Sequence, residues 1–182
     1  KCGGELEATV SKKRNPRIII FNIPEEITLE NAVQALTTQN QGLEKFENQI
    51  QTKFAFEDKR KNKNLILEVC SAARREILGR KLKLGWNMCN WDDYVKVGRC
   101  FKCCKYKHRA IDCRGQQTCP NCAENHAKKE CQSNKENFKC INCINYKKYN
   151  KDNSINENHS ALDPTCPCYQ AALKLYHQNT DY

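Results

Sequence analysis

Residues 17–95 carry short apolar segments separated by polar ones, in a pattern that predicts alternating strands and helices. The β-branched run over 17–23 stops at Pro24, which indicates a buried strand. Thr28 is followed by apolar residues at helical spacing, so it is expected to cap a helix. The order strand, helix, strand, strand, helix, strand is the ferredoxin-like βαββαβ arrangement, and residues 17–95 are therefore expected to form an α+β domain. Its further strands are expected over 46–56, 65–70 and 84–91, and its second helix over 71–81.

The same order of elements occurs in RNA-recognition motifs, which stack bases on aromatic side chains of the first and third strands. In this chain the expected stacking positions are Ile19 and Leu65, and Phe21 is the one aromatic residue available. Two interpretations stay open for this RNA-recognition-motif-like domain. It either serves self-association and positions the rest of the chain, which exposed aliphatic strands would favour, or it contacts RNA directly.

The segments that flank this domain carry weaker signals. Residues 1–16 hold a glycine pair, a basic cluster and a proline without sustained periodicity, so they are expected to be a flexible lead-in. One or both of Trp86 and Trp91 are expected to pack on the sheet, with a stacking role for Trp91 or Tyr94 as the alternative. The chain begins with Lys1 and is expected to be a fragment of a longer protein. No apolar run reaches the roughly eighteen residues of a membrane span, so no membrane partner is expected.

Beyond this domain the dominant pattern is a repeat of cysteine and histidine. Two cysteines stand two residues apart three times, and each pair is followed by one histidine and one more cysteine. The first two units have the spacings C-x2-C-x4-H-x4-C and C-x2-C-x3-H-x4-C. The third has a long loop over 144–158, rich in Asn and Lys, which is expected to be mobile. The twelve positions are Cys100, Cys103, His108 and Cys113, then Cys119, Cys122, His126 and Cys131, then Cys140, Cys143, His159 and Cys166.

Three thiolates and one imidazole form the tetrahedral ligand set that zinc takes in closed structural sites. Segments this short cannot bury a core, so metal binding must supply their folding free energy, and three zinc ions are expected. The third site is the least regular. Cys168 could replace Cys166 there, as Cys104 could replace Cys103 in the first unit. A disulfide framework is disfavoured, because it would not need a histidine at the matching place in each repeat.

The first two units resemble retroviral-type CCHC zinc knuckles, with Phe101 after the first cysteine, Lys105, and Ala110 two residues past the histidine. The three units together, ending in HSALDPTCPCY, resemble the Gag-like first-open-reading-frame protein of insect-type non-LTR retrotransposons. The resemblance implies a nucleic-acid-binding component of a ribonucleoprotein. The chain departs from the family by carrying Lys107 and Asn125 where knuckles usually have glycine before the histidine. Asn tolerates a left-handed conformation fairly well and Lys less so.

The positive charge gathers on the same region. Residues 98–151 carry 13 basic and 4 acidic side chains, against 17 and 13 in residues 1–97, and the chain has a formal charge of +10. Each occupied site has a charge of −1, because three thiolates balance all but one charge of the ion, so three zinc ions leave the chain at about +7. Cations interleaved with aromatic rings suit a single strand, because they neutralise phosphates while the rings stack on bases. The residues expected to contact nucleic acid are Arg99, Phe101, Lys102, Lys105, Tyr106, Lys107, Arg109 and Arg114.

These patterns predict a zinc-dependent protein that binds single-stranded RNA or DNA, and RNA above all. The alternative is a zinc-stabilised adaptor for protein partners, although the simple C-C-H-C repetition argues against the cross-braced ligands of ubiquitin-ligase domains. No open metal position or catalytic constellation stands out, so no enzyme and no small-molecule substrate are expected. Reduced thiolates imply an intracellular setting, in nucleus or cytoplasm. Beyond residues 17–95, the expected boundaries are knuckles over 99–114 and 118–132, a third knuckle with a long loop over 139–169, and a C-terminal helix or tail over 170–182.

Overall fold

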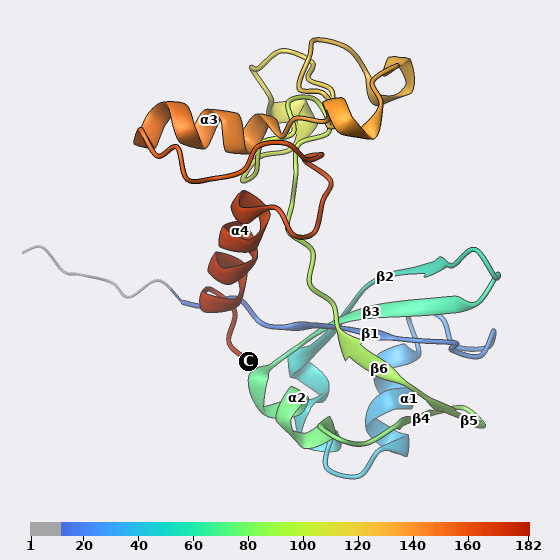
Figure 1. The fold of residues 1–182 in the computed structure, drawn as a ribbon. Coiled ribbons are helices and arrows are strands. Elements are labelled where there is room, and N and C mark those ends of the chain that lie inside the picture. The colour runs from blue at the N-terminus through green and yellow to red at the C-terminus, as the bar shows by residue number, and fades with distance from the viewer. Residues whose placement is uncertain (1–11) are drawn as a thin grey trace, which may run out of the picture. The chain divides into compact units, whose positions relative to one another are not determined.

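The computed structural model of the protein describes residues 12–182, so most of the expected lead-in and Cys2 lie outside the described residues. The chain divides into two compact units. One holds the described residues up to Val95 together with Asn179–Tyr182, and the other spans Lys96–Gln178 (Figure 1). Among the described residues, none of the helices has the length and apolar character needed to cross a bilayer.

The first unit is a mixed α+β domain built on a four-stranded sheet. The strands lie in the order β2-β3-β1-β6, and every neighbouring pair is antiparallel. Two helices separate the strands along the chain, and a turn of charged and polar residues joins β2 to β3. The elements are β1 (Arg17–Ile20), α1 (Ala32–Gln39), β2 (Ile50–Glu57), β3 (Lys63–Val69), α2 (Ser71–Ile77), β4 (Leu82–Leu84), β5 (Asn87–Cys89) and β6 (Trp91–Asp93), with a 3₁₀ turn over Glu44–Gln49.

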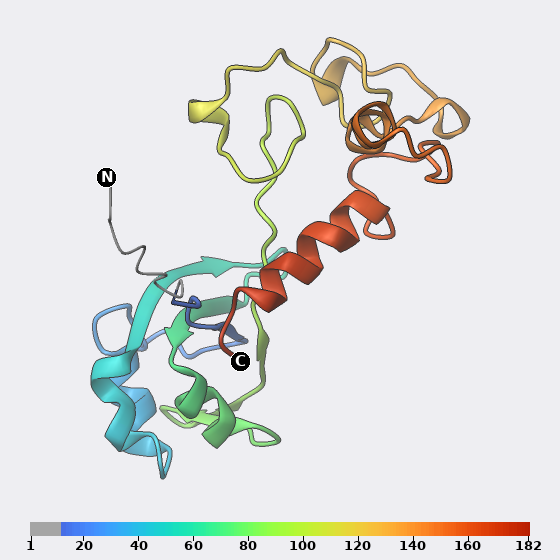
Figure 2. The ribbon, with the colours of Figure 1, turned by 90° about the vertical axis from the view of Figure 1, so that its left-hand side faces the viewer.

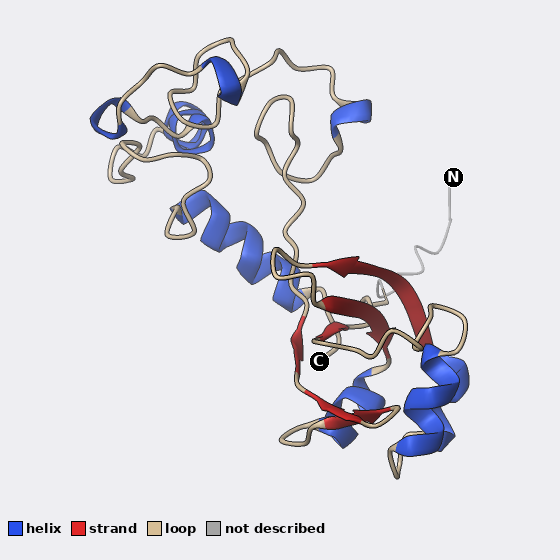
Figure 3. Cartoon of the chain, turned by 90° about the vertical axis from the view of Figure 1, so that its right-hand side faces the viewer, coloured by secondary structure: helices blue, strands red, loops and turns tan. Residues whose placement is uncertain are grey.

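The core lies between one face of the sheet and the two helices (Figure 3). Ile18 and Ile20 alternate with exposed or half-buried neighbours along β1, and their side chains are fully buried. Leu36 of α1 and Ile77 of α2 pack into the same cluster. A two-residue period on the strands and a helical period on α1 and α2 therefore bring their apolar residues into one layer.

The face of the sheet opposite the core carries different residues from those expected from the sequence. Leu65, expected at a stacking position, belongs to the buried core. Its neighbour Ile66, which is also fully buried, pairs with Ile19 on one side and with Phe54 on the other. A shift of one residue reverses the face of a strand residue, so the expectation was wrong for Leu65, while Ile19 lies on the face opposite the core.

The strand expected over 84–91 is instead a hairpin followed by a short strand. β4 and β5 pair across a two-residue turn in which Gly85 has a φ of 59°, a conformation that favours glycine. β6 then completes the main sheet beside β1. Trp91 packs against the core and donates its indole N–H to the carbonyl of Arg80 at 2.9 Å. Of the two tryptophans, Trp91 therefore packs as expected, whereas Trp86 stands at the tip of the hairpin and is 93% exposed.

The end of the expected lead-in is more ordered than its composition indicates. Pro16 is fully buried, and its carbonyl accepts a hydrogen bond from the Val69 amide at 3.0 Å. Arg14 pairs as a parallel bridge with Thr180, so the last residues of the chain belong to this unit. These pairings are long-range, and a search for local periodicity does not detect them.

The second unit consists mostly of long loops with single helical turns, over Ala110–Asp112, Lys128–Glu130 and Lys135–Asn137 (Figure 2). Its two longer helices are α3 (Ile141–Asn150) and α4 (Pro167–Gln178). The loop over 144–158 was expected to be mobile, but its first half is α3, which ends where Lys151 adopts a φ of 52°. Lys147 of α3 forms a salt bridge of 3.1 Å with Glu157 and ties the returning loop to the helix.

Candidate metal centres

The structure gathers the twelve cysteines and histidines into three groups of four. Within each group, one ligand atom from every residue lies within 4.8 Å of the other three. The ligands are not interleaved along the chain, since each group is complete before the next begins. The groups are Cys100, Cys103, His108 and Cys113 (site 1), Cys119, Cys122, His126 and Cys131 (site 2), and Cys140, Cys143, His159 and Cys166 (site 3).

The spacing of these atoms fits a tetrahedral zinc ion. Zinc–sulfur bonds of about 2.3 Å and zinc–nitrogen bonds of about 2.0 Å place neighbouring ligand atoms about 3.5 to 3.8 Å apart. In site 2, Cys122 Sγ lies 3.4 Å from His126 Nε2 and 3.9 Å from Cys131 Sγ. In site 3, Cys143 Sγ lies 3.6 Å from His159 Nε2 and 3.5 Å from Cys166 Sγ. Each group could hold one zinc ion, which confirms the expectation of three.

Backbone amides point at the sulfur atoms of the first two sites. Lys102 N–H donates to Cys100 Sγ at 3.4 Å, Gly115 N–H to Cys113 Sγ at 3.3 Å, and Asn121 N–H to Cys119 Sγ at 3.4 Å. Such donors disperse the negative charge of a coordinating thiolate and hold its orientation. The turns around the C-x2-C pairs therefore contribute their backbone as well as their side chains.

Tight turns place non-glycine residues in the left-handed region. Cys104 and Lys107 in the loop of site 1 have φ angles of 62° and 73°, and Ala123 in the loop of site 2 has a φ angle of 67°. Asn125, which tolerates this conformation better than Lys107, is not among the described residues with positive φ. A left-handed L-residue costs about 1–2 kcal/mol, so the first turn carries two such costs that metal binding must offset.

Each site contains one thiol with a lowered pKa and at least one with a raised pKa. Burial raises the pKa of Cys103 and Cys119 to about 11 each. A hydrogen bond with His126 lowers the pKa of Cys131 to about 6, and one with Cys140 lowers the pKa of Cys166 to about 4. Crowded thiolates repel one another, so full ionisation of a site requires a cation between the sulfur atoms.

A fifth cysteine adjoins site 3. Cys168 Sγ lies 3.7 Å from Cys143 Sγ, and burial raises the pKa of Cys168 to about 12. Cys104 is also buried, but its thiol donates to the carbonyl of Thr118 at 3.3 Å. The groups of four that could hold an ion contain Cys103 and Cys166, so these positions, rather than Cys104 and Cys168, complete the ligand sets.

Site 3 packs against the segment that carries site 1. Cys104 lies in one buried cluster with Cys140, Cys143 and Cys166. The side-chain amide of Asn142 donates to the Cys104 carbonyl at 3.0 Å. The guanidinium of Arg99 donates to the carbonyl of Ala161 at 2.8 Å. Burial and hydrogen bonds therefore both join these two sites.

Site 3 also packs against the segment that carries site 2. The Ala161 amide and the Ser160 hydroxyl both donate to the carbonyl of Pro120, at 2.7 and 3.0 Å. The Lys139 amide donates to the Asn121 carbonyl at 2.7 Å. The Thr118 N–H donates to the Lys102 carbonyl at 2.8 Å and so joins the segments of sites 1 and 2 directly. The three sites therefore pack together in one folded unit and are not independent small domains joined by linkers.

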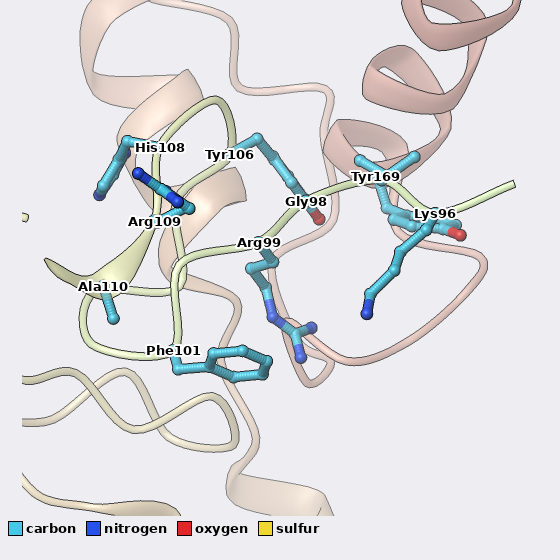
Figure 4. A pocket seen from close by; sticks show the side chains of 10 residues that line it. Lys96, Gly98, Arg99, Phe101, Tyr106, His108, Arg109, Ala110 and Tyr169 are labelled. Atoms are coloured by element: carbon cyan, nitrogen blue, oxygen red, sulfur yellow. The ribbon is translucent and has the colours of Figure 1, made fainter. Parts of the chain in front are cut away.

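A hollow of about 580 Å³ opens beside site 1 (Figure 4). Phe101, 82% exposed, lines it together with the cationic residues Lys96, Arg99 and Arg109. Tyr106 also lines it, but is half-buried and has its ring centroid 6.4 Å from that of Tyr169 on α4. The Tyr106 hydroxyl is buried and has no hydrogen-bond partner among the described residues, and burial raises its pKa.

The residues expected to contact nucleic acid thus differ in how available they are. Phe101 and the cations Lys105, Lys107, Arg109 and Arg114 are exposed, whereas Arg99 and Lys102 are partly buried. Arg109 forms an exposed salt bridge of 3.3 Å with Asp112, and such pairs are weak.

Sequence reasoning missed the other wall of this hollow and the aromatic side chains of the sheet. Tyr169 stands at the end of the expected third knuckle, and its place beside Tyr106 depends on the folding of site 3. Phe54 lies 6.2 Å from Phe56 and 6.0 Å from Tyr94, between ring centroids, and both phenylalanines are more than a third exposed. The alternating pattern over 46–56 contained this signal, since residues two apart share a face.

No family model, curated protein or solved structure matches the chain.

Proposed function

We propose that the protein is a zinc-dependent binder of single-stranded nucleic acid, with RNA as its ligand. The observation that carries this proposal is the exposed ring of Phe101, presented by a metal-binding turn and surrounded by cations. A large apolar ring in water has no stabilising role in the fold. It suits stacking on a base, while neighbouring Lys and Arg neutralise phosphates.

Zinc supplies the folding free energy of this surface. The second unit has few buried apolar residues outside the cysteine clusters. Once zinc is bound, each site is closed by four protein ligands, so the ion has a structural role and nucleic acid is bound by the surrounding side chains. Residues 98–151 carry 13 basic and 4 acidic side chains, and this segment stays positive after the three sites each contribute −1.

The hollow beside Phe101 suits an unstacked base. Phe101, Tyr106 and Tyr169 provide aromatic walls, and Lys96, Arg99 and Arg109 provide cations within the same lining.

The finer identities belong to the same proposal. The strand order β2-β3-β1-β6 supports a ferredoxin-like, RNA-recognition-motif-like domain, and the spacing of the first two ligand sets supports CCHC zinc knuckles. Together with the resemblance of the cysteine repeat, these features support a Gag-like component of a retrotransposon ribonucleoprotein. In this role the protein binds and carries the strand and has no catalytic function.

A second candidate is a zinc-stabilised adaptor that binds proteins through the sheet face. The observation in its favour is the aromatic group Phe54, Phe56 and Tyr94 on the face of the sheet that carries the half-buried Ile19. An adaptor of this kind would gain its affinity from the sheet face and would be insensitive to changes at Phe101.

The test compares two exposed residues of the same knuckle. Phe101→Ala should weaken binding of a labelled oligouridylate by about 1–3 kcal/mol, which is the usual value of one base stacked on an aromatic side chain. Ile111→Ala is the matched control, because Ile111 is 85% exposed and does not line the hollow. Equal affinity of wild type and Phe101→Ala in fluorescence anisotropy would reject stacking on this ring and favour the adaptor.

A further inference from the structure

The most exposed large apolar side chain of the first unit has no role in the fold. Trp86 is 93% exposed, at the tip of the β4–β5 hairpin. The two-residue turn holds it there, because Gly85 takes the left-handed position and Leu84 and Asn87 pair on either side. An indole in water costs solvation free energy, and such rings are enriched where one face receives a ligand.

Two adjoining hollows extend from this indole along the edge of the domain. The first, of about 300 Å³, is lined by Phe21, Trp86 and three asparagines, and the second, of about 530 Å³, reaches the turn between β2 and β3. The two share Phe21, Asn22 and Asn90. Figure 1 shows the ends of β1 and β5 and the β2–β3 turn on the same side of this unit. We call this surface the asparagine groove, and its residues are Phe21, Asn22, Asp58, Lys59, Arg60, Asn62, Trp86, Asn87, Met88, Cys89 and Asn90.

The groove offers amides with unused hydrogen-bonding capacity. In the described part of the chain, no group pairs with the side-chain amides of Asn22, Asn87 or Asn90. The backbone beside them is already paired, since Phe21 N–H donates to the Asn90 carbonyl at 2.9 Å and the Cys89 thiol donates to the Asn22 carbonyl at 3.7 Å. A side-chain amide has both donors and an acceptor, as the edges of nucleobases require.

Cations stand at the far end of the groove. Asp58 organises the β2–β3 turn by accepting from the amides of Arg60 at 2.7 Å and Asn62 at 3.0 Å. These hydrogen bonds lower the pKa of Asp58, the bond from the Asn62 amide contributing most. The turn thus presents Lys59 and Arg60 outward, and neither forms a salt bridge among the described residues.

The geometry points to the asparagine groove as a second nucleotide-binding site, in which a base of a single strand stacks on Trp86, asparagine amides contact its edge, and Lys59 and Arg60 hold the phosphates. The inference rests on the proposed function only for the class of ligand, and it uses none of the zinc sites. It also differs from the stacking positions expected on the first and third strands, which Ile19 and the buried Leu65 leave without aromatic rings.

The composition of the groove favours nucleic acid over a protein partner. A protein docking face needs a contiguous apolar patch. Here the apolar side chains are the Trp86 indole, the exposed Met88 and the half-buried Phe21. Asparagine amides lie between them, and the cations Lys59 and Arg60 follow beside Asp58, which is the composition of a stacking site on a charged track.

The test uses the zinc-loaded 182-residue chain with a labelled oligouridylate. Trp86→Ala should weaken binding about 5- to 150-fold, and Trp86→Phe should retain most of the affinity because the smaller ring still stacks. Arg60→Ala should lower the slope of log affinity against log salt by about 0.7. In the Trp91→Phe variant, Trp86 is the only tryptophan, and its emission should be quenched as the strand binds.

Leu78→Ala is the matched control, since Leu78 is 51% exposed and lies outside both hollows. The inference is overturned if Trp86→Ala binds like Leu78→Ala, or if Trp86 emission changes only with protein concentration, which would identify a protein-binding face. If Phe101→Ala binds like wild type while Trp86→Ala is impaired, the zinc-site proposal is rejected and this one stands. The opposite result would do the reverse.

Discussion

The packing of site 3 against the other two sites predicts that damage at site 3 spreads through the second unit. His159→Ala removes one ligand of site 3 and leaves every ligand of sites 1 and 2 in place. Without its ion, the segment that carries Asn142, Ser160 and Ala161 should unfold, because a site this small depends on its metal for folding.

The magnitude follows from the hydrogen bonds that this segment makes. Two link it to the segment of site 1, from the Asn142 side chain to the Cys104 carbonyl and from the Arg99 side chain to the Ala161 carbonyl. Three more link Ala161 and Ser160 to Pro120 and Asn121 in the segment of site 2. At about 0.5–1.5 kcal/mol net for each bond, site 1 should be destabilised by about 1–3 kcal/mol and site 2 by about 1.5–4.5 kcal/mol, which lowers their apparent zinc affinities about 5- to 150-fold and about 10- to 2,000-fold.

Titration with a chelator, followed by native mass spectrometry, measures this coupling. His159→Ala should carry two zinc ions and release them at chelator concentrations well below those needed for the wild type. His177→Ala is the control, because His177 is an exposed histidine of the same unit that belongs to no site. Release of the two remaining ions at the wild-type chelator concentration would show that the sites are independent and that the hydrogen bonds between them contribute nothing.

Three further predictions concern salt, pH and the first unit. Exchanging Lys102 and Lys105 for Ala should weaken binding of different sequences by a similar factor and reduce the salt slope by about 0.7 for each phosphate that is no longer neutralised, which titrations at several salt concentrations measure; an unchanged slope would contradict phosphate binding by these lysines. On acidification, all three sites should release zinc, because protons compete with the ion for the thiolates and the imidazole of each site; three zinc ions still bound at about pH 3, counted by mass spectrometry, would refute this. Arg74→Ala should lower the free energy of unfolding of the first unit by about 1–3 kcal/mol in urea, since Arg74 donates two hydrogen bonds to Asp93, one of 2.7 Å, and an unaffected midpoint would show that this pair is not stabilising.

Local patterns predicted most elements of the α+β domain and the three ligand sets, but the expected strand over 46–56 begins with a 3₁₀ turn and the one over 84–91 is a hairpin and a short strand. Alternating β-branched residues and a helical period are properties of neighbouring residues, so the strand at Arg17–Ile20 and the helix at Ala32–Gln39 lie within the expected ranges. The ligands of sites 1 and 2 were predictable for the same reason. They lie close together in the sequence, and short turns bring their atoms together.

Features that depend on distant contacts were not predictable in this way. The face taken by Leu65 follows from its register against β1 and β2, and a one-residue error in that register reverses it. The exposure of Trp86 depends on the left-handed turn at Gly85, a position that the apolar pattern places inside a strand. The packing of Asn142 on Cys104 joins residues 38 apart, and no repeat or period records such a contact.

The most direct measurement for the whole account is native mass spectrometry of the 182-residue chain with an oligouridylate at low ionic strength, before and after chelation. The account predicts a complex that contains three zinc ions and the strand, and it predicts that the strand dissociates when the ions are removed. A strand that stays bound to the zinc-free protein with equal affinity, or a zinc-loaded protein that takes up no strand at all, would contradict it.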